Sequence, residues 1–166
     1  TLTDECGNFI TADATFTIED TTDPFWVIQP SDMTVECDGT PDPSGAFASW
    51  LNSFSGDDAC GSATVTHNST GLSDDCGATG TETVTFTLTD ECGNFITADA
   101  TFTIEDTTDP FWVIQPSDMT VECDGTPDPS GAFASWLNSF SGDDACGSAT
   151  VTHNSTGLSD DCGATG

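Results

Sequence analysis

The sequence predicts a mainly β fold of antiparallel strands, organised as tandem modules with one short helix each. Two observations lead to this expectation. Residues 1–80 recur letter for letter as residues 87–166, so a unit of 86 residues repeats along the chain. Within the unit, apolar and polar residues alternate over short stretches that are separated by Gly, Pro, Asp and Asn. This pattern is typical of half-buried strands joined by turns.

The repeat also predicts how the chain is divided. We take residues 21–106 as a complete module, residues 1–20 as the closing hairpin strand of a preceding module, and residues 107–166 as a second module that lacks its last hairpin. The chain starts just after a counterpart of Thr81–Phe86 and stops just before another. We therefore expect head-to-tail continuity, in which residues 1–20 either pack against residues 107–166 of a neighbouring copy or continue a covalent chain.

The first half of the module is predicted to hold two strands and the helix. Phe25–Ile28 is a short apolar run, and residues 33–37 alternate between apolar and polar side chains. After a turn cluster rich in Asp and Pro, Ser44 is expected to cap a helix over Ala46–Phe54. Apolar residues follow the helical period there: Phe47, Trp50, Leu51 and Phe54.

The second half is predicted to hold a strand and a long hairpin. Residues 63–67 alternate as one strand. Residues 83–89 and 96–104 alternate strictly between Thr or Asp and larger apolar side chains, on either side of a Gly-Asn turn. Such a hairpin buries one face and leaves the Thr face outside. With about six strands, the module is expected to pack as an immunoglobulin-like antiparallel β-sandwich.

The hairpin also carries a resemblance to a known family. The sequence TVTFTLTDECGNFITADATFTIEDTTDP, with PSDMTVEC and DDACG, resembles the hyalin repeat (HYR) family, and in particular the HYR-like Cys-containing tandem repeats of bacterial secreted and surface proteins. The resemblance covers the whole 86-residue unit. It implies an immunoglobulin-like sandwich, a link to adhesion and extracellular matrix, and no catalytic residues. The cysteine positions differ from those of animal members, so their disulfide pattern does not transfer.

Composition excludes several classes of partner. The chain has 29 acidic residues and no Lys or Arg. Nucleic acid is excluded because nothing in the chain neutralises phosphate, and binding to an anionic membrane is excluded for the same reason. No apolar run has the roughly 18–20 residues of a membrane span, so membrane insertion is not expected. Perfect identity between the copies leaves no specialised position, so we do not expect an enzyme.

The cysteines predict an oxidising compartment. Each repeat has four, none in a CxxC pair, and such an even count in a small module indicates two disulfides per repeat. The strand that ends at Cys37 and the one that begins after Cys60 are predicted to be antiparallel neighbours, so we expect Cys37–Cys60. Cys76 is then bonded to Cys92 or to a cysteine of an adjacent module; the rival pattern is Cys37–Cys92 with Cys60–Cys76. The remaining positions of the pattern are Cys6, Cys123, Cys146 and Cys162.

Acidic loops are candidate calcium ligands. Asp57-Asp58, Asp74-Asp75 and the linker residues around Asp20 supply carboxylates, the hard oxygen ligands that Ca²⁺ prefers. At the junction between residues 21–106 and residues 107–166, we expect the linker to meet one loop from each of these two modules. The expected ligands there are Glu105, Asp106 and Asp109 of the linker, Asp74 and Asp75 of the module before it, and Asp143 and Asp144 of the module after it. The alternative is a solvated acidic surface.

Other motifs are weaker. Asn68 and Asn154 lie in Asn-Ser-Thr sequons, and Thr21 and Thr107 lie in an Asp-Thr-Thr motif that resembles a bacterial O-glycosylation acceptor. His67 and His153 are expected to be ordinary surface residues.

Taken together, the sequence predicts an extracellular or cell-surface tandem-repeat protein that forms a stalk, fibre or filament by stacking copies of its module head to tail. The alternative is an adhesin module that binds a glycan, a surface or ice, since the Thr row of the hairpin resembles that of ice-binding faces. An exposed Trp/Phe patch would favour binding, and burial of Phe25, Trp26 and Trp50 would favour the structural role.

Overall fold

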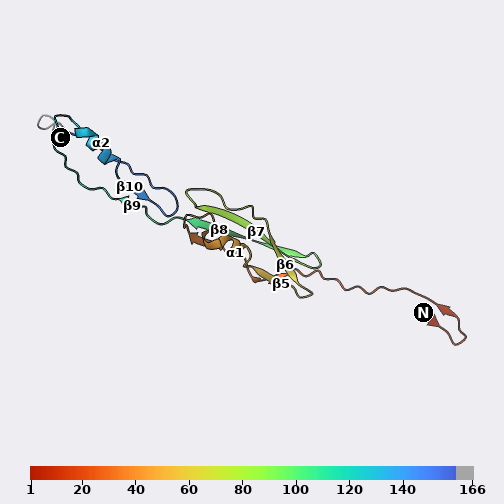
Figure 1. The fold of residues 1–166 in the computed structure, drawn as a ribbon. Coiled ribbons are helices and arrows are strands. Elements are labelled where there is room, and N and C mark those ends of the chain that lie inside the picture. The colour runs from red at the N-terminus through yellow and green to blue at the C-terminus, as the bar shows by residue number, and fades with distance from the viewer. Residues whose placement is uncertain (160–166) are drawn as a thin grey trace.

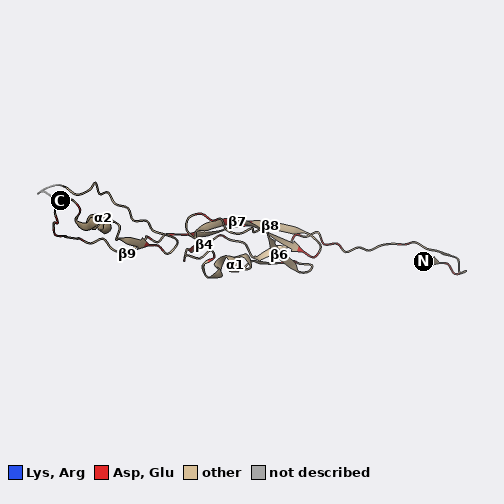
Figure 2. Ribbon diagram, turned by 45° about the horizontal axis from the view of Figure 1, so that its top comes forward, with Lys and Arg blue, Asp and Glu red and all other residues tan. Residues whose placement is uncertain are grey.

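The chain is elongated and mainly β, with three parts in a row (Figure 1). The computed structural model describes residues 1–159. The compact part in the middle is residues 21–106, here called the central module. Residues 107–159, the open module, lie at one end, and residues 1–20, the N-terminal segment, extend from the other end. Acidic residues occur along the whole length (Figure 2).

A four-stranded sheet forms one layer of the central module. Its strand order is β4-β8-β7-β6, with these bounds: β4 Met33–Glu36, β6 Ala63–His67, β7 Gly80–Asp90 and β8 Phe95–Glu105. The predicted hairpin is confirmed, since β7 and β8 pair antiparallel from Gly80 opposite Ile104 to Thr89 opposite Phe95. Strict alternation explains this, because every second residue of each strand lies on the buried face.

The order of strands corrects one expectation. β4 pairs with β8 in parallel, and β6 pairs with β7 antiparallel. The two outer strands therefore lie at opposite edges of the sheet, and the prediction that they are antiparallel neighbours is wrong. A fifth strand, β3 (Phe25–Ile28), pairs with a sixth, β5 (Ser55–Asp57), which confirms the expected number of strands in the module. β5 has no apolar alternation by which it could have been predicted.

The helix is shorter than predicted and is capped by a different residue. A 3₁₀ turn, η1 (Pro43–Gly45), leads into α1 (Ala46–Leu51). The N-cap position of α1 is Gly45, and Asp42 supplies the capping acceptor: its carboxylate accepts hydrogen bonds from the backbone N–H groups of Phe47 (2.8 Å) and Ala48 (3.3 Å). Ser44 makes no cap and has a left-handed backbone with φ 55°, so the prediction that it caps the helix is wrong.

The core lies between the sheet and α1. Val84, Phe86, Leu88 and Phe102 are fully buried on the sheet. Trp50 of α1 packs on them, with its ring centroid 5.3 Å from Phe86 and 5.5 Å from Phe102. Its indole N–H donates to the Ser31 carbonyl at 2.9 Å. Within the described residues, α1 and the β3–β5 pair face the sheet, so the module is mainly β without a complete second sheet of the predicted sandwich.

The open module forms only part of the same structure. β9 (Phe111–Ile114), η2 (Pro129–Gly131), α2 (Ala132–Leu137) and β10 (Ser141–Asp143) repeat β3, η1, α1 and β5. Residues 119–122 and 149–153 have the sequences of β4 and β6 and yet form no strand. The physical reason is that β4 pairs only with β8, and β6 with β7, and the described open module has neither.

The N-terminal segment is the tip of such a hairpin. β1 (Leu2–Thr3) pairs with β2 (Phe9–Ile10) in the register of their counterparts in β7 and β8, and residues 11–20 continue without a partner strand. No helix among residues 1–159 is long and apolar enough to cross a membrane.

Candidate functional site at the junction between repeats

The two ends of the central module carry different groups. At the upstream end, the hairpin tip at Asp90–Asn94 lies beside the incoming chain, because the Asn94 amide donates to the Asp20 carbonyl at 3.3 Å. At the downstream end, the Cys37 N–H donates to the Glu105 carbonyl at 2.8 Å, where β8 ends. The eleven residues of β8 separate these ends, a length of roughly 35 Å. Each repeat thus has one face for each neighbour.

A disulfide crosses the junction. Cys37 bonds to Cys146, 109 positions along the chain, which is the counterpart of Cys60 in the next repeat. The expected Cys37–Cys60 bond is therefore wrong, and so is the rival Cys37–Cys92. Cys60 precedes β6, whose first residue pairs with Asp90, so Cys60 lies at the upstream end, too far from Cys37 to bond.

The prediction that every cysteine of a repeat is oxidised is not met. Five of the described cysteines are free and exposed: Cys6, Cys60, Cys76, Cys92 and Cys123. Cys162 lies outside the described residues.

Close backbone contacts accompany the disulfide. The Ala78 N–H donates to the Cys146 carbonyl at 2.8 Å. Gly77, with φ +62°, lies so close to that carbonyl that a Cβ would overlap it. A Cβ on Gly39, with φ +82°, would lie 2.7 Å from the Ala145 oxygen. Both positions therefore need glycine for its left-handed backbone and for the room it leaves to the next repeat.

Glu36 holds the linker at the same end. Its carboxylate accepts hydrogen bonds from the Thr107 N–H (2.9 Å), the Thr107 hydroxyl (2.8 Å) and the Thr108 hydroxyl (3.1 Å). These bonds, first among them that from the Thr107 backbone, lower the pKa of Glu36. The Asp-Thr-Thr motif thus has a structural use, and the Thr107 hydroxyl, a predicted glycosylation site, is the donor to Glu36.

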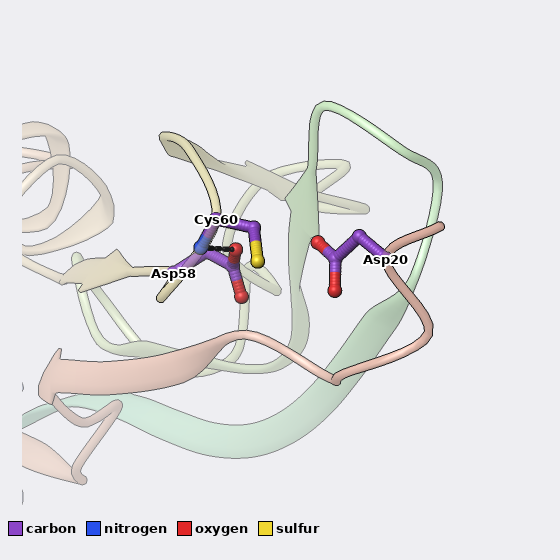
Figure 3. Close-up of side chains that lie close together, drawn as sticks. All are labelled: Asp20, Asp58 and Cys60. Carbon is purple, nitrogen blue, oxygen red and sulfur yellow. Dashed lines mark hydrogen bonds between the residues drawn. The ribbon is translucent and has the colours of Figure 1, made fainter. Parts of the chain in front are cut away.

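Two triads of possible metal ligands occupy the junctions. One is Asp20, Asp58 and Cys60, drawn in Figure 3. The other is Asp106, Asp144 and Cys146. In each triad the ligand atoms lie within 4.8 Å of one another, and the two triads are the same three positions in successive repeats. A linker carboxylate thus meets a loop of the module that follows it.

Asp58 gives the first triad a specific reason to bind a cation. Its side chain is only 8% exposed. One carboxylate oxygen, Oδ2, accepts the Cys60 N–H at 2.7 Å, whereas the other, Oδ1, is buried without any hydrogen-bond partner. Figure 3 shows the carboxylates of Asp58 and Asp20 facing each other on either side of the Cys60 sulfur. A buried carboxylate oxygen without a partner is unfavourable unless a cation compensates it.

The triads contain part of the predicted ligand set. Asp106 and Asp144 come together as expected. The other predicted ligands are not members of the triad: Asp74, Asp75, Glu105, Asp109 and Asp143. Asp74 and Asp75 are exposed in a loop that is bent back on itself by the bond from the Asp75 N–H to the Thr79 carbonyl, at 3.2 Å.

The state of the sulfur decides which metal fits. Asp20, burial and Asp58 all raise the pKa of the Cys60 thiol, so the protein by itself favours the protonated thiol there. Cys146, the counterpart, is oxidised and has no thiolate to offer. The remaining donors are carboxylates, which suit a hard cation such as Ca²⁺ better than Zn²⁺.

The remaining candidates belong to neither triad. His67 and His153 are exposed, and the Nδ1 atom of each accepts a backbone N–H two residues on, at 3.3 Å. Asn68, Asn154 and Thr21 are also exposed, and their glycosylation stays a prediction. The Thr row of β7 is partly paired across the hairpin, with the hydroxyls of Thr83 and Thr101 at 2.9 Å.

No family model, no curated protein and no solved structure matches this chain.

Proposed function

We propose that this chain is part of an extracellular structural protein, in which identical modules stack head to tail into a stalk, fibre or filament. The observation that carries the proposal is the Cys37–Cys146 disulfide, which joins the downstream end of one repeat to the upstream end of the next. A bond between two repeats at positions that recur in every repeat is suited to an array. It also favours an oxidising compartment.

Sequence identity extends the same geometry along an array. Cys60 has the sequence position of Cys146, and Cys123 has that of Cys37. Both are exposed and free in this chain. Each module therefore has one cysteine for the neighbour before it and one for the neighbour after it, so the linkage is able to continue without limit. The HYR-like immunoglobulin-type packing belongs to this proposal as the expected architecture of a fully assembled module.

Aromatic burial favours the structural role over the adhesin alternative. Trp50 is buried in the core and Trp26 is half-buried against it, whereas Phe25 is exposed. Two of the three diagnostic residues thus stabilise the module instead of forming a flat surface patch for a ligand.

Calcium at the junctions is the second element of the proposal. The paired carboxylates of each triad repel one another by roughly 1 kcal/mol at 4 Å even in water, and the chain has no Lys or Arg to compensate them. Ca²⁺ held by Asp106 and Asp144 ties the linker to the following module and so fixes the angle between repeats. Further oxygen ligands come from backbone or water, because Ca²⁺ takes six to eight.

The test is titration of the purified chain with Ca²⁺ by calorimetry, together with thermal unfolding with and without chelator. At a calcium concentration a hundred times the dissociation constant, stabilisation is about 2.7 kcal/mol, so chelation lowers the melting temperature by roughly 10 °C or more. Asp58→Asn removes one of the two triads and halves the stoichiometry. Asp74→Asn, an exposed carboxylate outside the triads, leaves it unchanged. Loss of binding in the Asp74 variant alone, or no binding by the unaltered chain, contradicts the assignment.

A further inference from the structure

We propose that the open module of one copy accepts the N-terminal segment of a second copy, which adds the missing strand β8 to it. The inference rests on the proposed head-to-tail function and deepens it by naming the partner and the contact. It depends on two exposed apolar surfaces that are present in the same chain, and on the central module, where the same two sequences lie against each other.

The acceptor is a groove of about 440 Å³ in the open module. Its apolar lining includes Met119, Val121, Phe133, Trp136 and Leu158. Met119, Val121 and Leu158 are exposed, although each is apolar. The counterparts of Met119 and Val121 in the central module lie beside β8, since Met33 pairs with Phe102 and Val35 with Ile104.

The central module shows what fills this groove. Phe102 and Ile104 of β8 are 0% and 3% exposed. Phe102 lies against α1, with its ring centroid 5.3 Å from Phe47 and 5.5 Å from Trp50. Phe47 and Trp50 are the counterparts of Phe133 and Trp136 in the groove. A strand with the sequence of β8 therefore has a defined position there.

The N-terminal segment has that sequence. Residues 9–19 are identical to β8, and Phe16 and Ile18 are the counterparts of Phe102 and Ile104. In this chain Phe16 and Ile18 are 88% and 87% exposed. The hairpin of β1 and β2 already has the native register, with Leu2 opposite Ile10 as Leu88 is opposite Ile96. Residues 11–20 are thus extended, apolar on one face and without a partner strand within the described chain.

The docked pair also brings two free cysteines together. In the docked pair, the second copy follows the open module of the first copy as the next repeat. Cys123 of the first copy then corresponds to Cys37, and Cys60 of the second copy corresponds to Cys146. The two thiols therefore lie where the Cys37–Cys146 disulfide lies within one chain. With glutathione disulfide as the oxidant, the two thiols lose two electrons and two protons. One S–S bond forms between the copies, and the glutathione disulfide is reduced to two glutathione thiols.

The docked module is less complete than the central one. The two segments together have no counterpart of Thr81–Phe86, so the places of the buried Val84 and Phe86 stay unfilled. A synthetic peptide with the sequence of residues 80–106 supplies the whole hairpin. We therefore expect this peptide to bind the open module more tightly than a second copy does, and to compete with it.

The experiment is sedimentation of the full chain over a range of concentrations in a non-oxidising buffer. The expected result is reversible association that the hairpin peptide reverses. Phe16→Asp weakens the association roughly a hundredfold or more, the range expected for loss of a buried Phe. Phe9→Asp is the matched control: Phe9 lies on the same segment and is 67% exposed, and its counterpart Phe95 remains 60% exposed in the central module. Neither residue belongs to the central module, so its folding is unaffected.

Glutathione disulfide then tests the geometry of the docked pair. The covalent link between copies is expected to join Cys60 to Cys123, to be lost in Cys60→Ser, and to persist in Cys76→Ser. It is mapped by mass spectrometry after cleavage at acidic residues, because the chain has no Lys or Arg for trypsin. Concentration-independent monomers, equal effects of the two Phe variants, or links through other cysteines overturn the proposal. If the chain stays monomeric and keeps the Cys37–Cys146 bond, the docking of separate copies is wrong, but the proposed array within a longer chain is not contradicted.

Discussion

Replacing Cys37 by Ser tests the junction disulfide directly. The bond closes a loop of 109 positions that contains β6, β7 and β8, and hence the core of the central module. Loop-closure entropy for this length stabilises the folded state by roughly 5 kcal/mol, which is comparable with the whole stability of a small domain. We expect Cys37→Ser to lower the free energy of unfolding by up to that amount, measured by urea denaturation monitored through Trp fluorescence.

The chain offers a matched control for this change. Cys123 has the same surroundings in sequence as Cys37 but is a free thiol, so Cys123→Ser is expected to leave the stability unchanged. Reduction of the unaltered chain should reproduce the loss seen in Cys37→Ser. Equal stability of the two Ser variants and of the unaltered oxidised chain would refute both the connectivity and the magnitude.

Two further predictions use contacts on either side of this bond. Trp50→Ala should destabilise the central module by about 3–5 kcal/mol because Trp50 is buried. Trp136→Ala, the same change at the half-buried counterpart, should lower the free energy of unfolding clearly less in the same denaturation experiment. Equal decreases for the two variants would contradict the assignment of the core. Glu36 has a lowered pKa, so the stabilisation that it gives the linker is present above its usual value of 4.5 and is lost as pH falls through the lowered value. The NMR chemical shift of the Thr107 amide should change with pH as Glu36 is protonated, and this change should be absent in Glu36→Gln. A chemical shift that stays constant down to pH 2 would argue against the contact.

Local periodicity predicted the long hairpin because residues 83–89 and 96–104 alternate strictly, which allows only one face of each strand to be buried. The predicted helix ends within three residues of the observed one, since its apolar spacing is regular. The predicted capping residue was wrong. Ser and Asp are both common capping residues, so the sequence alone does not distinguish Ser44 from Asp42. In the structure, Ser44 has a left-handed backbone and makes no cap, and the Asp42 carboxylate accepts the Phe47 N–H of the helix.

The disulfide was mispredicted for a topological reason. Sequence order suggests that the strands next to Cys37 and Cys60 are neighbours, whereas the sheet places them at opposite edges and the two cysteines at opposite ends. The candidate metal site was found in part. Its linker carboxylate, Asp106, and its partner Asp144 were predicted from the idea of a junction, but the triad includes neither Asp74 nor Asp75 of the preceding module.

Perfect repetition makes the division between sequence and tertiary structure visible within one chain. Composition, the 86-residue period and the alternation of apolar residues determined by themselves a mainly β, acidic repeat with a short helix. β3, α1 and β5 reappear in the open module as β9, α2 and β10, so they form without the four-stranded sheet, although β5 has no apolar alternation. Only the tertiary structure determines whether the sequence MTVE forms a strand: it does so at Met33–Glu36 and does not at residues 119–122. The physical reason is that its backbone hydrogen bonds are made with β8, so a short strand forms only where that partner is present.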